Sequence, residues 1–282
     1  MFIQGLCLGL APIRVLPELG KQGESSGSKP KTTTSWYQDS VDTNFLNSKG
    51  CNVANGVDQG DQPKQGLGIM SFGSPVKLGT DSWGASAFNQ DPVDTGQIRT
   101  AINAWGKGFF DCLNAGNRPQ TDYRIAPGVT NQYPADWGTV QASNHGDQWA
   151  RMVSNIREYF EAQGYAGDVT AWGAVDMEIG YDGAIVSRHW AGGYQAVSGR
   201  PGYVNFGDAA GCEDFDAEGY GACGGPDDNW ESTDVHYVSS KIPVALPLPQ
   251  IYREDGVQAE QWVMISKYGY DTSNGILPSN LH

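Results

Sequence analysis

Short apolar runs alternate with amphipathic segments along most of this chain, and this alternation constrains the fold more than any other feature. The apolar runs have the length and residue types of β-strands. They are Trp36–Asp42, Gly66–Phe72, Tyr123–Val129, Val169–Glu178, Tyr203–Phe206, Val235–Val238 and Val244–Ile251. The amphipathic segments have apolar residues at helical spacing, and they are Asp94–Asn114, Asp147–Gly164, Ser187–Val197 and Asp255–Tyr268. A strand followed by a helix, repeated roughly every 30 to 45 residues, predicts an α/β protein with a parallel sheet.

Among parallel α/β folds, the pattern favours a (β/α)8 barrel over a doubly wound sheet. The chain has no GxGxxG fingerprint of a dinucleotide-binding sheet. Its 282 residues suit one barrel. About seven predicted strands fall short of the eight that a barrel needs. The chain ends soon after its last predicted helix, at Ile276–His282, so we expect a TIM-barrel-like fold that is truncated at its C-terminus.

The N-terminal residues differ in composition from the rest. Residues Phe2–Leu16 are mildly apolar, too short and too interrupted by Gly and Pro to span a bilayer, and are interpreted as a signal-peptide remnant or an extension. Residues Gly20–Thr34 are rich in Gly, Ser, Lys and Thr, which is typical of a flexible linker. We therefore expect an extension and linker over residues 1–35 and one barrel domain over residues 36–282.

Composition excludes several classes of partner. The formal net charge is −14, which argues against nucleic acid because phosphate binding needs clustered Lys and Arg. The same charge disfavours an anionic membrane surface, and no segment predicts a transmembrane helix. Charged residues make up only 18% of the chain, whereas aromatic and amide residues are plentiful. This balance is typical of extracellular proteins that handle carbohydrate.

The five cysteines favour an oxidising compartment. Cys212 and Cys223 share one Gly- and Asp-rich loop and predict a local disulfide, while Cys51 and Cys112 could form a longer bridge. Cys7 is then left over. No CxxC pair occurs, so a zinc ribbon or a thiol redox motif is not expected. Disulfides are favoured over free thiols, which predicts an extracellular or cell-envelope protein.

Neither a metal centre nor a serine nucleophile is expected. The four histidines form no HExxH or HxH pattern, and no GxSxG elbow occurs. Acidic residues gather around the Cys212–Cys223 loop, where a solvated surface is favoured over a Ca²⁺ site because EF-hand spacing is missing. They are Asp214, Asp216, Glu218, Asp227 and Asp228. We expect no cofactor.

The segment Ala171–Asp182 carries the strongest chemical signal. Asp176 and Glu178 lie two residues apart at the end of an apolar strand, so their side chains should project from the same side. Glycoside hydrolysis uses one protonated carboxyl and one ionised carboxyl in this way. The alternative is that Asp176 binds a neighbouring loop or Arg188 and that Glu178 alone faces the cleft.

Polar residues follow several other predicted strands, where a barrel would bring them to one face. The candidates for substrate binding are Asp39, Asp42, Asn131, Gln132, Trp172, Asp208 and Tyr252. Asp39 and Asp42 are equally well interpreted as turn residues, and Asp182 as a loop residue. The tryptophans expected in the core are Trp105, Trp149, Trp190 and Trp262. Those expected on a binding surface are Trp36, Trp83, Trp137, Trp172 and Trp230, of which Trp172 is nearest in sequence to the acidic pair.

The run Trp172–Glu178 resembles the strand-end Asp-x-Glu of glycoside-hydrolase TIM barrels, particularly the family-25 muramidase-like group and its uncharacterised relatives. The resemblance covers about a tenth of the chain. It implies that Asp176 and Glu178 match the acidic pair and that Asp39 or Asp42 matches an aspartate of the first strand.

The sequence therefore predicts an exported glycoside hydrolase that acts on polysaccharide or peptidoglycan. Glu178 would be the acid, with Asp176 as base, nucleophile or stabiliser. Asn131, Gln132 and Tyr252 would orient the sugar, with Trp172 beneath it. The alternative function is a non-catalytic barrel domain that binds carbohydrate or the cell envelope.

Overall fold

A parallel sheet forms the centre of the molecule. The computed structural model describes residues 32–62, 64–87, 90–212, 221–224 and 229–272. The seven-stranded sheet has the order β1-β2-β6-β8-β9-β12, with β7 also paired to β6. Its strands are β1 (Thr32–Tyr37), β2 (Gln65–Ser71), β6 (Asp122–Thr130), β7 (Val169–Ala171), β8 (Gly173–Asp176), β9 (Tyr203–Asn205) and β12 (Ala245–Pro247). All its pairings are parallel, as predicted, so the carboxyl ends of its strands lie along one edge.

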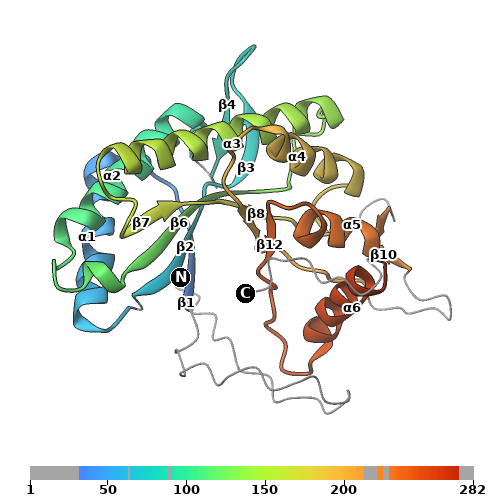
Figure 1. Ribbon diagram of the computed structural model, residues 1–282. Coiled ribbons are helices and arrows are strands. Elements are labelled where there is room, and N and C mark those ends of the chain that lie inside the picture. Colours follow the sequence, from blue (N-terminus) through green and yellow to red (C-terminus); the bar gives the residue numbers. More distant parts are fainter. Residues whose placement is uncertain (1–31, 63, 88–89, 213–220, 225–228, 273–282) are drawn as a thin grey trace.

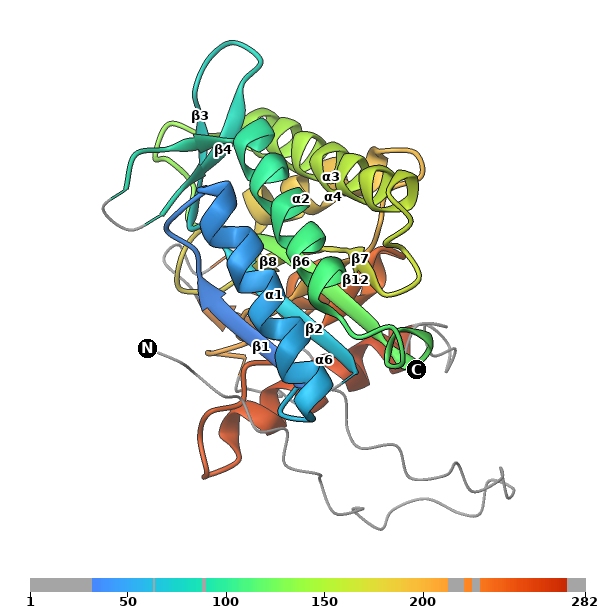
Figure 2. The ribbon, with the colours of Figure 1, turned by 90° about the vertical axis from the view of Figure 1, so that its left-hand side faces the viewer.

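Long helices cover one face of this sheet, as Figures 1 and 2 show. They are α1 (Thr43–Gln59), α2 (Thr95–Cys112), α3 (Thr139–Ala162) and α4 (Ala184–Ala196). Because side chains alternate along a strand, Met70 and Val175 pack into the large core beneath the helices. Their neighbours Ile69 and Ala174 lie on the opposite face, in a small apolar cluster that also contains Ala126. The fold is thus mixed α/β, with two unequal faces on its sheet.

Shorter elements complete the described part of the chain. An antiparallel sheet of β3 (Ser74–Lys77), β4 (Trp83–Ser86) and β5 (Val93–Asp94) follows β2. The remaining elements are η1 (Arg118–Gln120), β10 (Ala222–Gly224), β11 (Trp230–Glu231), α5 (Ser232–His236), η2 (Tyr237–Lys241) and α6 (Val257–Thr272). No helix among the described residues is both long enough and apolar enough to cross a bilayer.

The predicted strand Val235–Val238 is wrong, because this segment lies in α5 and in the π-helix η2. Val235 and Val238 are both buried, and a spacing of three places them on the same side of a helical turn. An apolar run this short does not distinguish a strand from a buried helix. The predicted strand Trp36–Asp42 also extends too far, since β1 ends at Tyr37 and Asp42 caps α1.

Both predicted disulfides are present in the structure. Cys51–Cys112 connects α1 with the last residue of α2, and Cys212–Cys223 closes a local loop. Cys7 lies outside the described residues. The core tryptophans Trp105, Trp149, Trp190 and Trp262 are buried as predicted. Trp83 and Trp230, expected on a binding surface, are instead 5% and 1% exposed. Trp230 belongs to the large core, and the ring of Trp83 packs against Trp137 and His145.

Candidate functional site

The site lies at the carboxyl edge of the parallel sheet, where β8 ends. Asp176 is the last residue of β8, shares the face of Ala174, and is 3% exposed. Glu178 follows two residues later and is half-buried. This is the strand end at which the acidic pair was predicted.

Gln250, which follows β12, connects the two acidic side chains. Its Nε2 donates to Oδ1 of Asp176 at 3.0 Å and to Oε1 of Glu178 at 3.4 Å. The same nitrogen donates to the carbonyl oxygen of Phe206 at 2.9 Å. One amide group therefore reaches both carboxyl groups, so the two project into a common space.

A third carboxyl group comes from the loop after β9. Asp208 accepts hydrogen bonds from the backbone N–H groups of Ala210 and Ile179, the former at 3.3 Å. Its negative charge raises the pKa of both Asp176 and Glu178. Asp208, a predicted substrate-binding residue, thus lies beside the acidic pair.

Burial is the largest cause of the raised pKa of each carboxyl group of the pair. Burial, then the charges of Glu178 and Asp208, raise the pKa of Asp176 to about 8, against the hydrogen bond from Gln250. Burial and Asp208 also raise the pKa of Glu178, while hydrogen bonds from Gln250 and Tyr181 lower it. Asp176 is therefore mostly protonated at neutral pH. Arg188 does not neutralise it, because its guanidinium is paired with Asp234 at 2.7 Å.

Two buried asparagines hold the backbone that carries the pair. Asn131 accepts from the N–H of Glu178 at 3.0 Å, and its Nδ2 donates to the Glu178 carbonyl at 3.1 Å. Asn205 accepts from the N–H of Met177 at 3.3 Å, and its Nδ2 donates to Ser239 Oγ at 2.9 Å. Asn131 was expected to orient a sugar, but it is fully buried and its amide is used within the protein.

Three exposed tyrosines surround the carboxyl groups. Tyr37 at the end of β1 is 58% exposed, Tyr181 after β8 is 37% exposed, and Tyr252 after β12 is 61% exposed. The pKa of each tyrosine is raised, first by burial and then by the charges of Asp176 and Glu178. These electrostatic effects place all three near the acidic pair. Tyr252 was predicted, whereas Tyr37 and Tyr181 were missed although each follows a predicted strand or lies within one.

The other predicted site residues lie elsewhere or have local roles. Asp42 is the N-cap of α1, where its side chain accepts from the N–H of Phe45 at 2.7 Å. Asp39 is exposed, and its charge raises the pKa of Lys49 against the larger lowering effect of burial. Gln132 is exposed and accepts from Ser74 Oγ at 3.2 Å.

Trp172 lies away from the acidic pair, near the opposite ends of the strands. It precedes Asp176 by four residues, which is about 13 Å along a strand. Its ring lies 4.8 Å from the Arg124 guanidinium and lines a cavity of about 170 Å³ together with Leu67 and Leu246. Trp172 was expected beneath the reacting sugar, but its ring lies at this cavity instead.

The described residues contain no group of three or more His, Cys, Asp or Glu arranged to hold a metal ion. The acidic residues considered for Ca²⁺ lie outside the described residues. Comparison with protein-family models, curated proteins and solved structures finds no match.

Proposed function

We propose that the protein is an exported glycoside hydrolase with Asp176 and Glu178 as its catalytic carboxyl groups. The observation that carries this proposal is the bridging of both carboxyl groups by Gln250 at the carboxyl edge of a parallel sheet. The strands lie in the sheet in the order in which they occur along the chain, which is compatible with a (β/α)8 barrel. In such barrels the reactive residues lie at the carboxyl ends of the strands. The two disulfides support export.

The raised pKa values support different roles for the two carboxyl groups. The pKa of Asp176 is about 8, so this carboxyl group is mostly protonated at neutral pH, and Asp176 is assigned as the acid. Glu178 is more exposed and is assigned as the group that acts in its ionised form, as base or nucleophile. The sequence suggested Glu178 as the acid. The two roles are exchanged here because Asp176 is more deeply buried than Glu178.

The surroundings of the pair support a glycan substrate, either a polysaccharide or the glycan of peptidoglycan. Tyr37, Tyr181 and Tyr252 offer partly exposed aromatic faces, on which sugar rings pack through their C–H groups. Gln132 adds an exposed amide two residues after the end of β6. Sugar rings would then be held by aromatic contacts near the acidic pair.

A non-catalytic glycan-binding domain is the second candidate. Asp176 is 3% exposed, and a carboxyl group so deeply buried is also compatible with a purely structural role. The exposed tyrosines alone would then bind the glycan.

The experiment is a screen for released reducing ends from chitin, β-glucan and peptidoglycan. Replacing Glu178 by Gln keeps the side-chain shape but removes the ionisable group. We expect Glu178→Gln to reduce turnover about 10² to 10⁴-fold while glycan binding is retained. Glu161→Gln, an exposed change on α3, is the matched control and should keep full activity.

Binding of a glycan by the wild type without any cleavage would exclude the hydrolase and favour the second candidate. Full activity in Glu178→Gln would exclude Glu178 as a catalytic group.

A further inference from the structure

Gln250 makes more contacts at the site than its two amide hydrogens can serve separately. Its Nε2 lies 2.9 Å from the Phe206 carbonyl oxygen, 3.0 Å from Asp176 Oδ1 and 3.4 Å from Glu178 Oε1. One hydrogen is directed to the carbonyl, so the other is shared between the two carboxyl groups. The longer distance to Glu178 is consistent with this sharing.

The carbonyl of Phe206 also determines which way the amide faces. A backbone carbonyl only accepts, so the amide nitrogen rather than the amide oxygen must lie against it. If the amide were flipped, its oxygen would face the Phe206 carbonyl oxygen, and neither of these two oxygens can donate a hydrogen bond. Gln250 is thus fixed as a donor to the pair.

The backbone around Gln250 is held on two sides. On the side of β9, the N–H of Leu248 donates to the Asn205 carbonyl at 2.7 Å, and the N–H of Gln250 donates to the Gly207 carbonyl at 3.3 Å. Asn205 also holds the backbone of Met177, so the same residue positions both partners of the contact.

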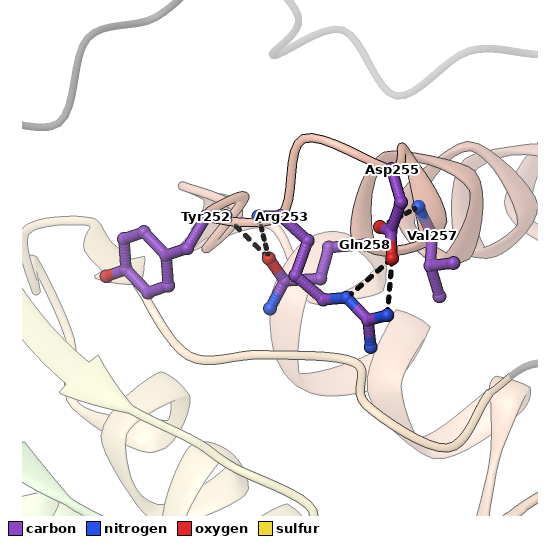
Figure 3. A network of polar contacts seen from close by, with 5 residues as sticks. All are labelled: Tyr252, Arg253, Asp255, Val257 and Gln258. Carbon is purple, nitrogen blue, oxygen red and sulfur yellow. Dashed lines mark hydrogen bonds and ion pairs between the residues drawn. The ribbon is translucent and has the colours of Figure 1, made fainter.

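On the side of α6, one glutamine side chain holds the loop, as Figure 3 shows. Oε1 of Gln258 accepts from the N–H groups of Tyr252 and Arg253, the latter at 2.9 Å. Asp255 accepts from Arg253 Nε at 2.9 Å and from the N–H of Val257, the first residue of α6, at 3.2 Å. The loop that carries Gln250 and Tyr252 is therefore attached to the start of this helix.

We propose that Gln250 is a positioning residue that holds Asp176 and Glu178 together and stabilises their ionised forms, by donating one hydrogen to both carboxyl groups at once. A donor stabilises the ionised form of its acceptor, so Gln250 favours ionisation of the pair. Its consequence for catalysis rests on the proposed function, whereas its effect on the carboxyl groups does not.

The other groups around the pair act in the opposite direction or on one member. Asp208, from the loop after β9, disfavours ionisation of both carboxyl groups, and Tyr181 donates to Glu178 alone. Tyr37 from β1 and Tyr252 from the Gln250 loop face the pair as neutral phenols. No Lys or Arg of the described residues is among the groups that shift the pKa of Asp176. A neutral amide therefore takes the place that a cation often has beside paired carboxylates.

The test is a ¹³C-carboxyl NMR titration of the folded protein, with the two resonances assigned by their loss in Asp176→Asn and Glu178→Gln. In Gln250→Met, which keeps the side-chain length but removes the amide, we expect the pKa values of both carboxyl groups to rise. Gln250→Asn, one methylene shorter, should give the same direction. Gln120→Met is the control. Gln120 is the last residue of η1 and accepts a hydrogen bond from Lys64, so its replacement should leave both pKa values unchanged.

Unchanged pKa values in a folded Gln250→Met or Gln250→Asn would overturn the proposal. Loss of the fold in both variants would also overturn it, because Gln250 would then be a general structural residue. Where a glycan is cleaved, the acid limb of the pH–rate profile of kcat should move to higher pH in the same variants. If no glycan is cleaved, the hydrolase assignment fails while the titration still decides the role of Gln250.

Discussion

At the scale of single residues, the buried carboxyl group of Asp176 is the most consequential. Its pKa in the folded protein is about 8, against an ordinary value of 3.8, because burial and two neighbouring carboxylates oppose its charge. The folded state therefore binds this proton more tightly than the unfolded state does. The site thus holds a group that works against the stability of the fold at alkaline pH.

The sign of this effect on stability follows from proton linkage. Between pH 3.8 and about 8 the unfolded chain has released the proton of Asp176 and the folded protein retains it, so rising pH favours unfolding across this window. We expect Asp176→Asn, which carries no ionisable group, to have a smaller loss of stability from pH 5 to pH 8. Urea unfolding of both proteins at several pH values measures this. Parallel pH dependences would contradict the raised pKa.

The carboxyl pair was predictable from sequence, but its partner was not. Asp176 and Glu178 are two residues apart at the end of an apolar run, and strand periodicity places them together. Gln250 lies 72 residues after Glu178, and its contact with the pair depends on β12 lying beside β9. Asn131 was correctly expected at the carboxyl edge of the sheet. Its expected role of orienting a sugar differs from the contacts found, because a sequence does not show which polar groups form hydrogen bonds within the protein.

At the scale of elements, the helix pairs α1–α2 and α3–α4 pack through reciprocal glycines. A Cβ on Gly50 would lie 2.0 Å from the Trp105 carbonyl oxygen, and one on Gly108 would lie 1.9 Å from that of Asn47. Gly146 and Gly193 repeat the arrangement between α3 and α4, at 2.1 and 2.0 Å from backbone oxygens. Each pair of helices approaches so closely that only a hydrogen atom fits at the crossing.

These glycines also explain why the sequence did not indicate α1. The buried face of α1 consists of Leu46, Gly50, Ala54 and Val57, two of which are too small to give a strong apolar period. Helices α2, α3, α4 and α6 were predicted, and each has a buried tryptophan among its apolar residues. Close helix packing by small residues thus reduces the signal from which helices are recognised.

Two adjacent glycines of α4 give a test with opposite expected signs. A Cβ on Gly193 would meet the backbone of Ser143, so Gly193→Ala should destabilise the fold by about 1 to 3 kcal/mol through overpacking. A Cβ on Gly192 would meet nothing closer than the Tyr237 hydroxyl at 3.9 Å. Gly192→Ala should therefore stabilise the fold by about 0.5 to 1 kcal/mol through helix propensity. Chemical denaturation of both variants measures the difference, and equal effects would refute the packing argument.

At the scale of the whole molecule, the predicted alternation of strands and helices is present as a parallel sheet with covering helices. The antiparallel sheet β3–β5 was missed, because its short strands lie in a Gly- and Ser-rich stretch between β2 and α2. The segment Val235–Val238 was misassigned because it is a short apolar run, buried in a helical turn where α5 packs against α6. Long periodic segments were thus predictable, whereas short segments that depend on distant contacts were not.

The longer disulfide contributes at this scale as well. Cys51 and Cys112 are 61 residues apart in sequence, so their bridge restricts a large loop of the unfolded chain. We expect the double change Cys51→Ala and Cys112→Ala to lower the free energy of unfolding by about 2 to 4 kcal/mol. Thermal unfolding of the wild type and the double variant under oxidising conditions measures this. A matching stability in the two proteins would show that the bridge adds nothing to the packing of α1 on α2.

The order of the described strands in the sheet has a consequence for how the chain acquires its structure during synthesis. The strands of the described seven-stranded sheet lie side by side in chain order, with β7 added beside β6, so each strand pairs with a strand that precedes it in the same sheet. Cys51 and Cys112 both precede β6 in the chain, and Cys212 and Cys223 are 11 residues apart. The sheet can therefore grow by one strand at a time as the chain emerges, with the carboxyl groups meeting their amide partner only when β12 is added.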